Sequence, residues 1–168
     1  MIGFFGSRKC RDYETIKSIL RALMRQENLQ VVTGDCRGVD ELTYRACKEL
    51  GIPVRVFVVK DNPLGYSPEK DDIVEVVQGV NLVAALRKRT VRVVRYVKEH
   101  GGVLVGYQVD GKGSQLAIRT ARELGVPVFV VDRDARKLRR LEQKQTARPT
   151  ESPNVRLKDE IRGRKGGR

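Results

Sequence analysis

Cysteine, histidine and aromatic residues are scarce in this sequence. Among its 168 residues there are three cysteines, one histidine and no tryptophan. The cysteines, Cys10, Cys36 and Cys47, are odd in number, and their spacings suit neither a disulfide framework nor a zinc site. Because His100 is the only histidine, the sequence also argues against a histidine-based catalytic triad and a histidine-ligated metal. We therefore expect no metal site, and we expect His100 and Gly101 only to end a helix.

Long apolar runs are missing as well. No stretch reaches the roughly 20 residues that a membrane-spanning helix needs, and the chain does not open with a secretory leader. These absences predict a cytoplasmic protein without a membrane partner. The apolar share of 40% over 168 residues is enough for a single domain with a sizeable core.

Acidic residues are outnumbered, and the formal net charge is +13. The excess is concentrated in residues 133–168, where 13 Lys or Arg face five Asp or Glu and leave a net +8. The composition therefore divides the chain into a domain over 1–132 and a basic tail over 133–168. In the tail, residues 135–145 could form a charged helix, whereas 163–168 cannot build a core and are expected to be disordered or partner-bound. Such charge favours polyanions without specifying one.

Short apolar segments alternate with amphipathic ones along residues 1–132. The predicted strands are Met1–Phe5, Gln30–Thr33, Val54–Val59, Val103–Val105 and Pro127–Val131. The third is apolar at nearly every position, which is typical of a strand covered on both faces. This order predicts an α/β fold, a Rossmann-like parallel sheet with helices on both faces.

The predicted helices follow from apolar residues at helical spacing. They are expected after Asp12 as N-cap, over 37–50, over 71–86, over 89–99 and after Ser114. The segment 71–86 is rich in valine and interrupted by Gly79 and Asn81. In the segment 89–99, Val91, Val94 and Val97 are expected to face the core.

One glycine-rich segment carries most of the functional signal. The run Val31-Val32-Thr33-Gly34-Asp35-Cys36-Arg37-Gly38-Val39-Asp40 predicts a buried strand, a turn and the start of a helix. Gly34 and Gly38 allow the backbone to approach a ligand closely, and the free N–H groups of the helix, together with Arg37, favour an anion. The spacing of the two glycines matches neither the dinucleotide fingerprint nor the Walker loop. A tight turn without a ligand is the alternative.

An internal repeat strengthens the ligand hypothesis. Residues 45–54 and 119–128 share the ending Glu-Leu-Gly-(Ile/Val)-Pro-Val, and each copy follows a strand and a glycine loop. Right-handed crossovers would place both loops at one edge of the sheet, beside the turn Gly6-Ser7-Arg8. Three such turns at the carboxyl ends of parallel strands favour a nucleotide site.

Taken together, three motifs resemble the SLOG superfamily over about residues 1–131. They are Gly6-Ser7-Arg8, Thr33-Gly34-x-x-Arg37-Gly38-x-Asp40 and Gly111-Lys112-Gly113-Ser114. The superfamily includes the Lonely Guy phosphoribohydrolases, molybdenum-cofactor carriers and a DNA-processing recombinase loader, and small members with a Ser-Gly-Gly-Ala-Arg-Gly-Ala-Asp motif are the most similar. The resemblance implies a Rossmann-like fold with a phosphate site.

This chain departs from the superfamily pattern at three points. Asp35-Cys36 stands where the small members often carry Gly-Ala. Ala117 stands where the phosphoribohydrolases carry their catalytic glutamate, which argues against N-glycosidic hydrolysis by their mechanism. Relatives also carry an Arg-Asn pair ahead of the fourth strand, and Arg89-Thr90 matches it only in part.

The predicted ligand-binding residues come from the three glycine turns. They are Gly6, Ser7, Arg8, Thr33, Gly34, Asp35, Arg37, Gly38, Asp40, Gly111, Lys112, Gly113 and Ser114. The glycines would expose N–H groups to phosphate, the basic side chains would neutralise its charge, and the hydroxyls would donate hydrogen bonds or simply cap helices. Asp40 could contact a ribose, orient Arg37 or complement the start of its helix.

We therefore expect a protein that binds a phosphate-containing small molecule, a nucleotide or nucleotide derivative, as a homodimer and without a catalytic residue or further cofactor. The first alternative is nucleic-acid binding through the tail and a basic stripe comprising Arg89, Arg92, Arg95 and Lys98. The plainer interpretation of that stripe is a solvated helix face. The second alternative is a nucleotide hydrolase with Asp35 or Glu41 as base, although no nucleophile is paired with either.

Overall fold

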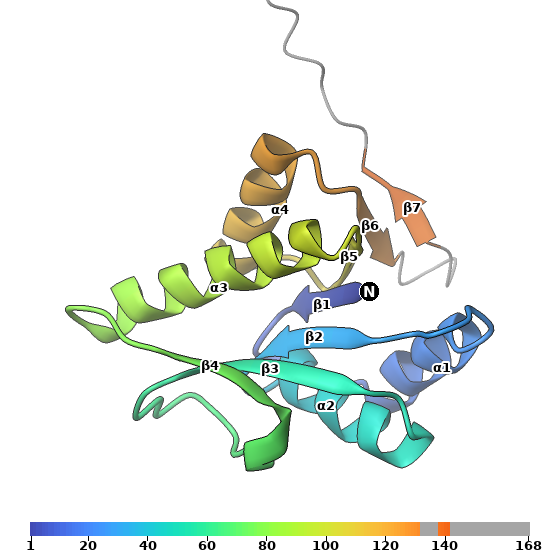
Figure 1. Ribbon diagram of the computed structural model, residues 1–168, viewed down its shortest axis with the longest axis horizontal. Coiled ribbons are helices and arrows are strands. Elements are labelled where there is room, and N and C mark those ends of the chain that lie inside the picture. The colour runs from blue at the N-terminus through green and yellow to red at the C-terminus, as the bar shows by residue number, and fades with distance from the viewer. Residues whose placement is uncertain (132–137, 142–168) are drawn as a thin grey trace, which may run out of the picture.

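The computed structural model of the chain describes residues 1–131 and 138–141 (Figure 1). The described residues form one seven-stranded sheet in the order β4-β3-β2-β1-β5-β6-β7. The strands are β1 (Ile2–Gly6), β2 (Val31–Gly34), β3 (Val54–Val59), β4 (Ile73–Val77), β5 (Val103–Tyr107), β6 (Val128–Val131) and β7 (Leu138–Arg140). The first six pair in parallel, and β7 is antiparallel to β6.

Four helices cover the two faces of this sheet. Helices α1 (Tyr13–Leu23) and α2 (Val39–Leu50) pack on one face, and α3 (Leu82–Glu99) and α4 (Lys112–Leu124) on the other (Figure 1). The predicted Rossmann-like α/β arrangement is therefore confirmed. Within the described residues, no helix has both the length and the apolar composition needed to cross a membrane.

The core is divided by the sheet into two clusters. Consecutive strand residues point to opposite faces, so Phe4 packs with α1 and α2, whereas Val32 packs with α3 and α4. The largest buried side chains on the first face include Ile16 of α1, and those on the second include Val97 of α3. Both faces of the sheet are therefore buried under helices, which explains why the central strands are apolar at nearly every position.

The helix ends follow the predicted capping signals. The carboxylate of Asp12 accepts a hydrogen bond from the backbone N–H of Thr15 at 3.2 Å and caps α1. Gly51 and Gly125 end α2 and α4 with φ values of +66° and +69°, a left-handed conformation that costs glycine little. The internal repeat is therefore two copies of one helix end followed by a strand.

The helix predicted over 71–86 is wrong except at 82–86, which belong to α3. Residues 73–77 form strand β4 at the edge of the sheet, after a single 3-10 turn over 70–72. Four of the five residues of this strand are β-branched, which favours a strand over a helix. Helix α3 begins only at Leu82, where the side chain of Asn81 accepts from the N–H of Ala84 at 2.9 Å. On α3, Val94 and Val97 are buried as predicted, whereas Val91 is only partly buried and Val93 is buried in addition.

The helix predicted over 135–145 is also wrong where the structure describes it. Residues 138–140 form β7, which pairs with β6 and adds a seventh strand beyond the predicted domain boundary at 132. The N–H of Leu141 donates to the carbonyl of Val128 at 2.9 Å. The rest of the predicted basic tail over 133–168 lies outside the described residues.

Candidate functional site

The carboxyl ends of β1, β2 and β5 lie next to one another, because these parallel strands are neighbours in the sheet. Each strand leads through a short turn to the start of a helix: 7–12 precedes α1, 35–38 precedes α2 and 108–111 precedes α4. Only β1 separates β2 from β5, so the carboxyl ends of these two strands are about 10 Å apart, given a strand spacing of about 4.8 Å. One nucleotide is long enough to reach both.

Close backbone packing joins these turns. A Cβ atom at Gly6 would overlap the carbonyl oxygen of Tyr107, and one at Gly38 would overlap the carbonyl oxygen of Ser7. Gly38 also has a φ of +83°, which other residues rarely adopt. The N–H of Val39 donates to that Ser7 carbonyl at 3.1 Å. Glycine is thus required at both positions by the packing of the chain itself, with or without a ligand.

A buried arginine fills the space over the β2 turn. The Nη1 atom of Arg89 donates to Oδ2 of Asp40 at 2.9 Å and lies 3.4 Å from Oδ1 of Asp35. Its Nη2 atom lies 3.4 Å from Sγ of Cys36. A Cβ at Gly34 would overlap this guanidinium, so Gly34 makes room for Arg89. We call Arg89, Asp35, Asp40 and Cys36 the buried charge cluster.

Burial controls the protonation of this cluster. It raises the pKa of Asp40, although the nearby Arg89 guanidinium lowers it in part. Burial lowers the pKa of Arg89, but the carboxylates of Asp40 and Asp35 outweigh this effect and keep the guanidinium protonated. Burial also raises the pKa of the Cys36 thiol, which is therefore protonated and a poor nucleophile at neutral pH. With two carboxylates and one guanidinium, the cluster is at most singly negative.

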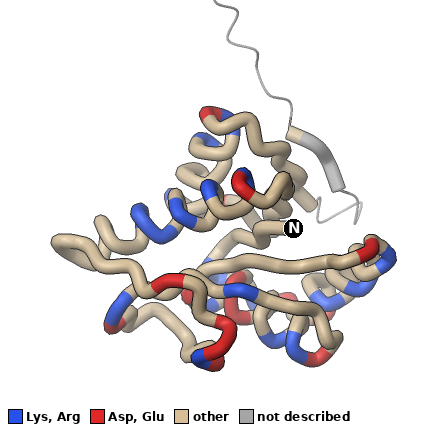
Figure 2. The backbone as a smooth tube through the Cα atoms, viewed as in Figure 1, with Lys and Arg blue, Asp and Glu red and all other residues tan. Residues whose placement is uncertain are grey.

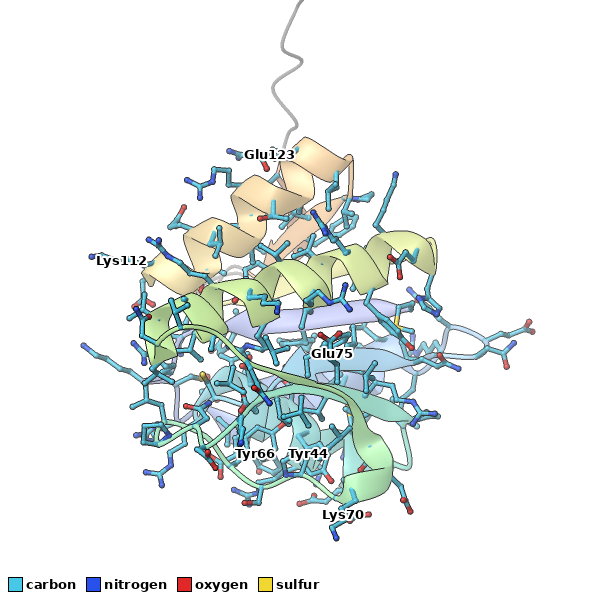
Figure 3. All side chains as sticks on the ribbon, turned by 60° about the vertical axis from the view of Figure 1, so that its left-hand side comes forward. Tyr44, Tyr66, Lys70, Glu75, Lys112 and Glu123 are labelled. Carbon is cyan, nitrogen blue, oxygen red and sulfur yellow. The ribbon has the colours of Figure 1, made fainter. Side chains whose placement is uncertain are left out.

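A loop after β3 covers the β2 turn. The Oδ2 atom of Asp35 accepts hydrogen bonds from the N–H of Val59 at 2.9 Å and from Nδ2 of Asn62 at 3.0 Å. The hydroxyl of Tyr66 donates to the carbonyl of Gly34 at 3.0 Å, and burial raises the pKa of Tyr66 well above its ordinary value. The Tyr66 ring lies 5.3 Å from that of Tyr44, and both project from the α2 side of the sheet (Figure 3).

Two backbone donors of the β2 turn are already used. The N–H of Cys36 donates to the carboxylate of Asp40, and the N–H of Arg37 donates to the carbonyl of Leu64. The Nε atom of Arg37 also donates to a backbone carbonyl, that of Gly65, at 3.3 Å, although the side chain is exposed. The Gly34 turn is thus a packed and partly negative structure, with few donors left for a phosphate.

The turn before α4 is different. Neither Gly38 at α2 nor Gly111 at α4 supplies a side-chain hydrogen bond to the first helical N–H groups. At α2 the N–H of Val39 donates to the carbonyl of Ser7 instead, whereas the first N–H groups of α4 are left for solvent or a ligand. A Cβ at Gly111 or at Gly113 would meet no atom within 4 Å. Lys112 is exposed and points away from the body of the molecule (Figure 3). The start of α4 therefore combines free donors, the positive end of a helix dipole and an exposed cation at one accessible place.

The remaining predicted ligand residues divide into buried and exposed ones. The hydroxyl of Thr33 donates to the carbonyl of Phe4 at 3.0 Å inside the sheet, so it serves the fold. Ser7 is buried and its Oγ accepts from the N–H of Lys9 at 3.2 Å, while Ser114 is buried on the inner side of α4. Arg8 is exposed on the turn after β1.

One of the four residues of the predicted basic stripe is buried rather than exposed. Arg92, Arg95 and Lys98 are exposed on α3, whereas Arg89 is buried at 8% relative exposure and belongs to the charge cluster at the end of β2. Sequence reasoning missed this role, although the partial match of Arg89-Thr90 to the Arg-Asn pair of SLOG proteins was a usable signal. No sequence pattern pointed to Tyr66, because its partner Gly34 lies 32 positions away.

The chain has no match among the models of known protein families or among the curated proteins. Within residues 1–131 and 138–141, no group of three or more His, Cys, Asp or Glu side chains is arranged to hold a metal ion. The inference about function therefore rests on the geometry of the strand-end turns and on the charges around them.

Proposed function

We propose that the protein binds a nucleotide or nucleotide derivative at the carboxyl edge of its sheet, with a phosphate at the start of α4. The observation that carries this proposal is the uncapped start of α4, where Gly111 and Gly113 leave space and Lys112 is exposed. This start lies at the same sheet edge as Arg8. From the sequence motifs alone, the β2 turn and the turn before α4 are equally good candidates for the phosphate site.

The charge cluster argues for placing the phosphate at α4 rather than at α2. A phosphate beside Gly34 would face the carboxylates of Asp35 and Asp40, and like charges repel. The sugar or base can instead approach the α2 side, where Arg37 is exposed. The ligand would then lie across the carboxyl end of β1, from the start of α4 toward the α2 side.

We further propose that binding occurs without catalysis. Position 117, where the phosphoribohydrolases carry a glutamate, holds a buried alanine on the inner side of α4. Asp40 is paired with Arg89, and Cys36 is a buried thiol. These groups are better suited to fixing the turn than to activating water. Membership of the SLOG superfamily is also proposed, because Arg89, the partial match to the Arg-Asn pair, lies against Gly34 of the second glycine motif.

Calorimetric titration tests the site. A panel of the four common nucleoside monophosphates, with inorganic phosphate beside them, is titrated into the full chain and into Lys112→Ala. Loss of a charge-assisted hydrogen bond should weaken binding by about 1.5–3 kcal/mol. Lys70→Ala is the matched control, because Lys70 is exposed on the 3-10 turn, away from the start of α4 (Figure 3). Equal affinities for both variants would remove Lys112 from the site.

A further inference from the structure

A basic groove lies on the other face of the molecule from the α1–α2 layer, between β4, α3 and α4. Its volume is about 580 Å³. Its charged lining consists of Glu75, Arg87, Lys88, Arg92, Arg95 and Arg119. Val91 and Leu116 supply the apolar part of the lining. The basic positions follow α3 and α4 in Figure 2, and Glu75 lies under α3 in Figure 3.

The groove has a strong excess of positive charge. Five cations face one carboxylate, which leaves a net +4. Glu75 neutralises Arg92, whose Nε and Nη2 atoms lie 2.9 and 2.6 Å from its Oε2. Arg119 lies only 4.0 Å from Glu123, and both side chains are about two-thirds exposed, so that pair is weak. Among the described residues, Arg87 and Arg95 have no anionic partner, and they remain available to an external anion.

The arrangement of cations on α3 follows from its amphipathic sequence. Lys88, Arg92 and Arg95 recur at helical spacing on the outer face, while Val94 and Val97 face the core. Their span is about 10 Å at 1.5 Å per residue. A concave, like-charged surface concentrates its field and attracts anions more strongly than a flat one. A basic helix face that only contacts solvent would need neither a groove beside it nor a further cation from another helix. Here the groove is present, and α4 contributes Arg119 to it.

We propose that this groove binds the phosphodiester backbone of double-stranded nucleic acid without sequence preference. Along the axis of a duplex, the span of about 10 Å on α3 corresponds to three base-pair steps at 3.4 Å each. Arg119 approaches the same backbone from α4. The lining contains no aromatic residue on which an unpaired base would stack, which favours a duplex over a single strand. This site is separate from the nucleotide site at the start of α4.

Fluorescence anisotropy of the full chain with a labelled 20-base-pair duplex, measured over a range of salt concentrations, tests the proposal. The variant Arg95→Ala/Arg119→Ala removes two phosphate contacts. The slope of log affinity against log salt should become shallower by about 1.8, at about 0.9 per contact. At 0.1 M salt this corresponds to roughly 60-fold weaker binding than that of the unaltered chain. Circular dichroism should be unchanged, because both side chains are exposed.

Two further variants make the test specific. Arg21→Ala/Arg25→Ala changes the charge equally at exposed positions in and just after α1, on the other side of the sheet, and should leave the slope almost unchanged. Glu75→Gln frees Arg92 and should strengthen binding by several fold. The basic tail is present in every variant, so its contribution cancels. Unchanged duplex affinity in the groove variant, or an equal loss in the α1 variant, would overturn the proposal.

Discussion

Replacing Arg89 with methionine removes the guanidinium that lies between Asp35 and Asp40. Methionine keeps much of the apolar volume, but it leaves two carboxylates in the interior without their cation. Removing one partner of a buried ion pair costs about 3–5 kcal/mol. For a domain of this size the melting temperature should therefore fall by about 10 °C or more. Arg87→Met, at an exposed position two residues earlier on α3, should change stability by less than about 0.5 kcal/mol.

The cost of Arg89→Met should depend on pH. Burial raises the pKa of Asp40 in the folded protein above its ordinary value of 3.8, and loss of Arg89 raises it further. A carboxyl whose folded pKa is raised stabilises the fold below its unfolded pKa and loses that contribution as pH rises through the folded value. The penalty of the variant should therefore be largest near neutral pH and shrink toward pH 4.

Urea denaturation followed by circular dichroism at both pH values measures these differences. Adding Asp40→Asn to Arg89→Met should recover part of the stability, because an amide replaces the unpaired charge. Two results would contradict the role of Arg89 in neutralising buried carboxylates. One is that Arg89→Met is as stable as Arg87→Met at neutral pH, and the other is that its stability penalty grows on acidification. Either result would mean that the cluster is hydrated rather than buried.

Three further substitutions test the turns. Gly34→Ala should destabilise the fold by about 1–3 kcal/mol in denaturant titrations, because its Cβ would overlap the Arg89 guanidinium. Gly113→Ala should instead stabilise α4 by up to about 1 kcal/mol while weakening nucleoside monophosphate binding in calorimetry, and unchanged binding would argue against a ligand there. Tyr66→Phe should cost about 0.5–1.5 kcal/mol through the lost hydrogen bond to Gly34, and no measurable change would mean that water replaces it.

Much of the fold could be predicted because its signals are local. Asp12 and Gly51 mark helix ends through contacts within a few residues, and five apolar segments became strands of the sheet. Strand β4 was missed because five residues with only one buried side chain carry little periodicity of either kind. The edge position of β4 depends on pairing with β3, which no short window of sequence reveals.

The site was predicted less completely, for a related reason. The sequence indicated which turns meet at the sheet edge, but not which turn remains accessible. That distinction depends on Arg89 and Tyr66, which come from distant segments and fill the space around Gly34. A glycine that leaves room for a ligand, as proposed for Gly113, and a glycine that leaves room for a buried guanidinium, as at Gly34, look the same in a sequence. Only the packing around Gly34 and Gly113 separates them.

Nitrogen–proton correlation spectra during titration with nucleoside monophosphates test the central claim most directly. We expect the largest shifts at the amides of Lys112, Gly113 and Ser114, with smaller shifts at Arg8 and Arg37. Inorganic phosphate should move the three α4 amides alone. Shifts confined to the groove of α3, or no saturable shift at the start of α4 with any of the four nucleotides, would contradict the assignment of the phosphate site.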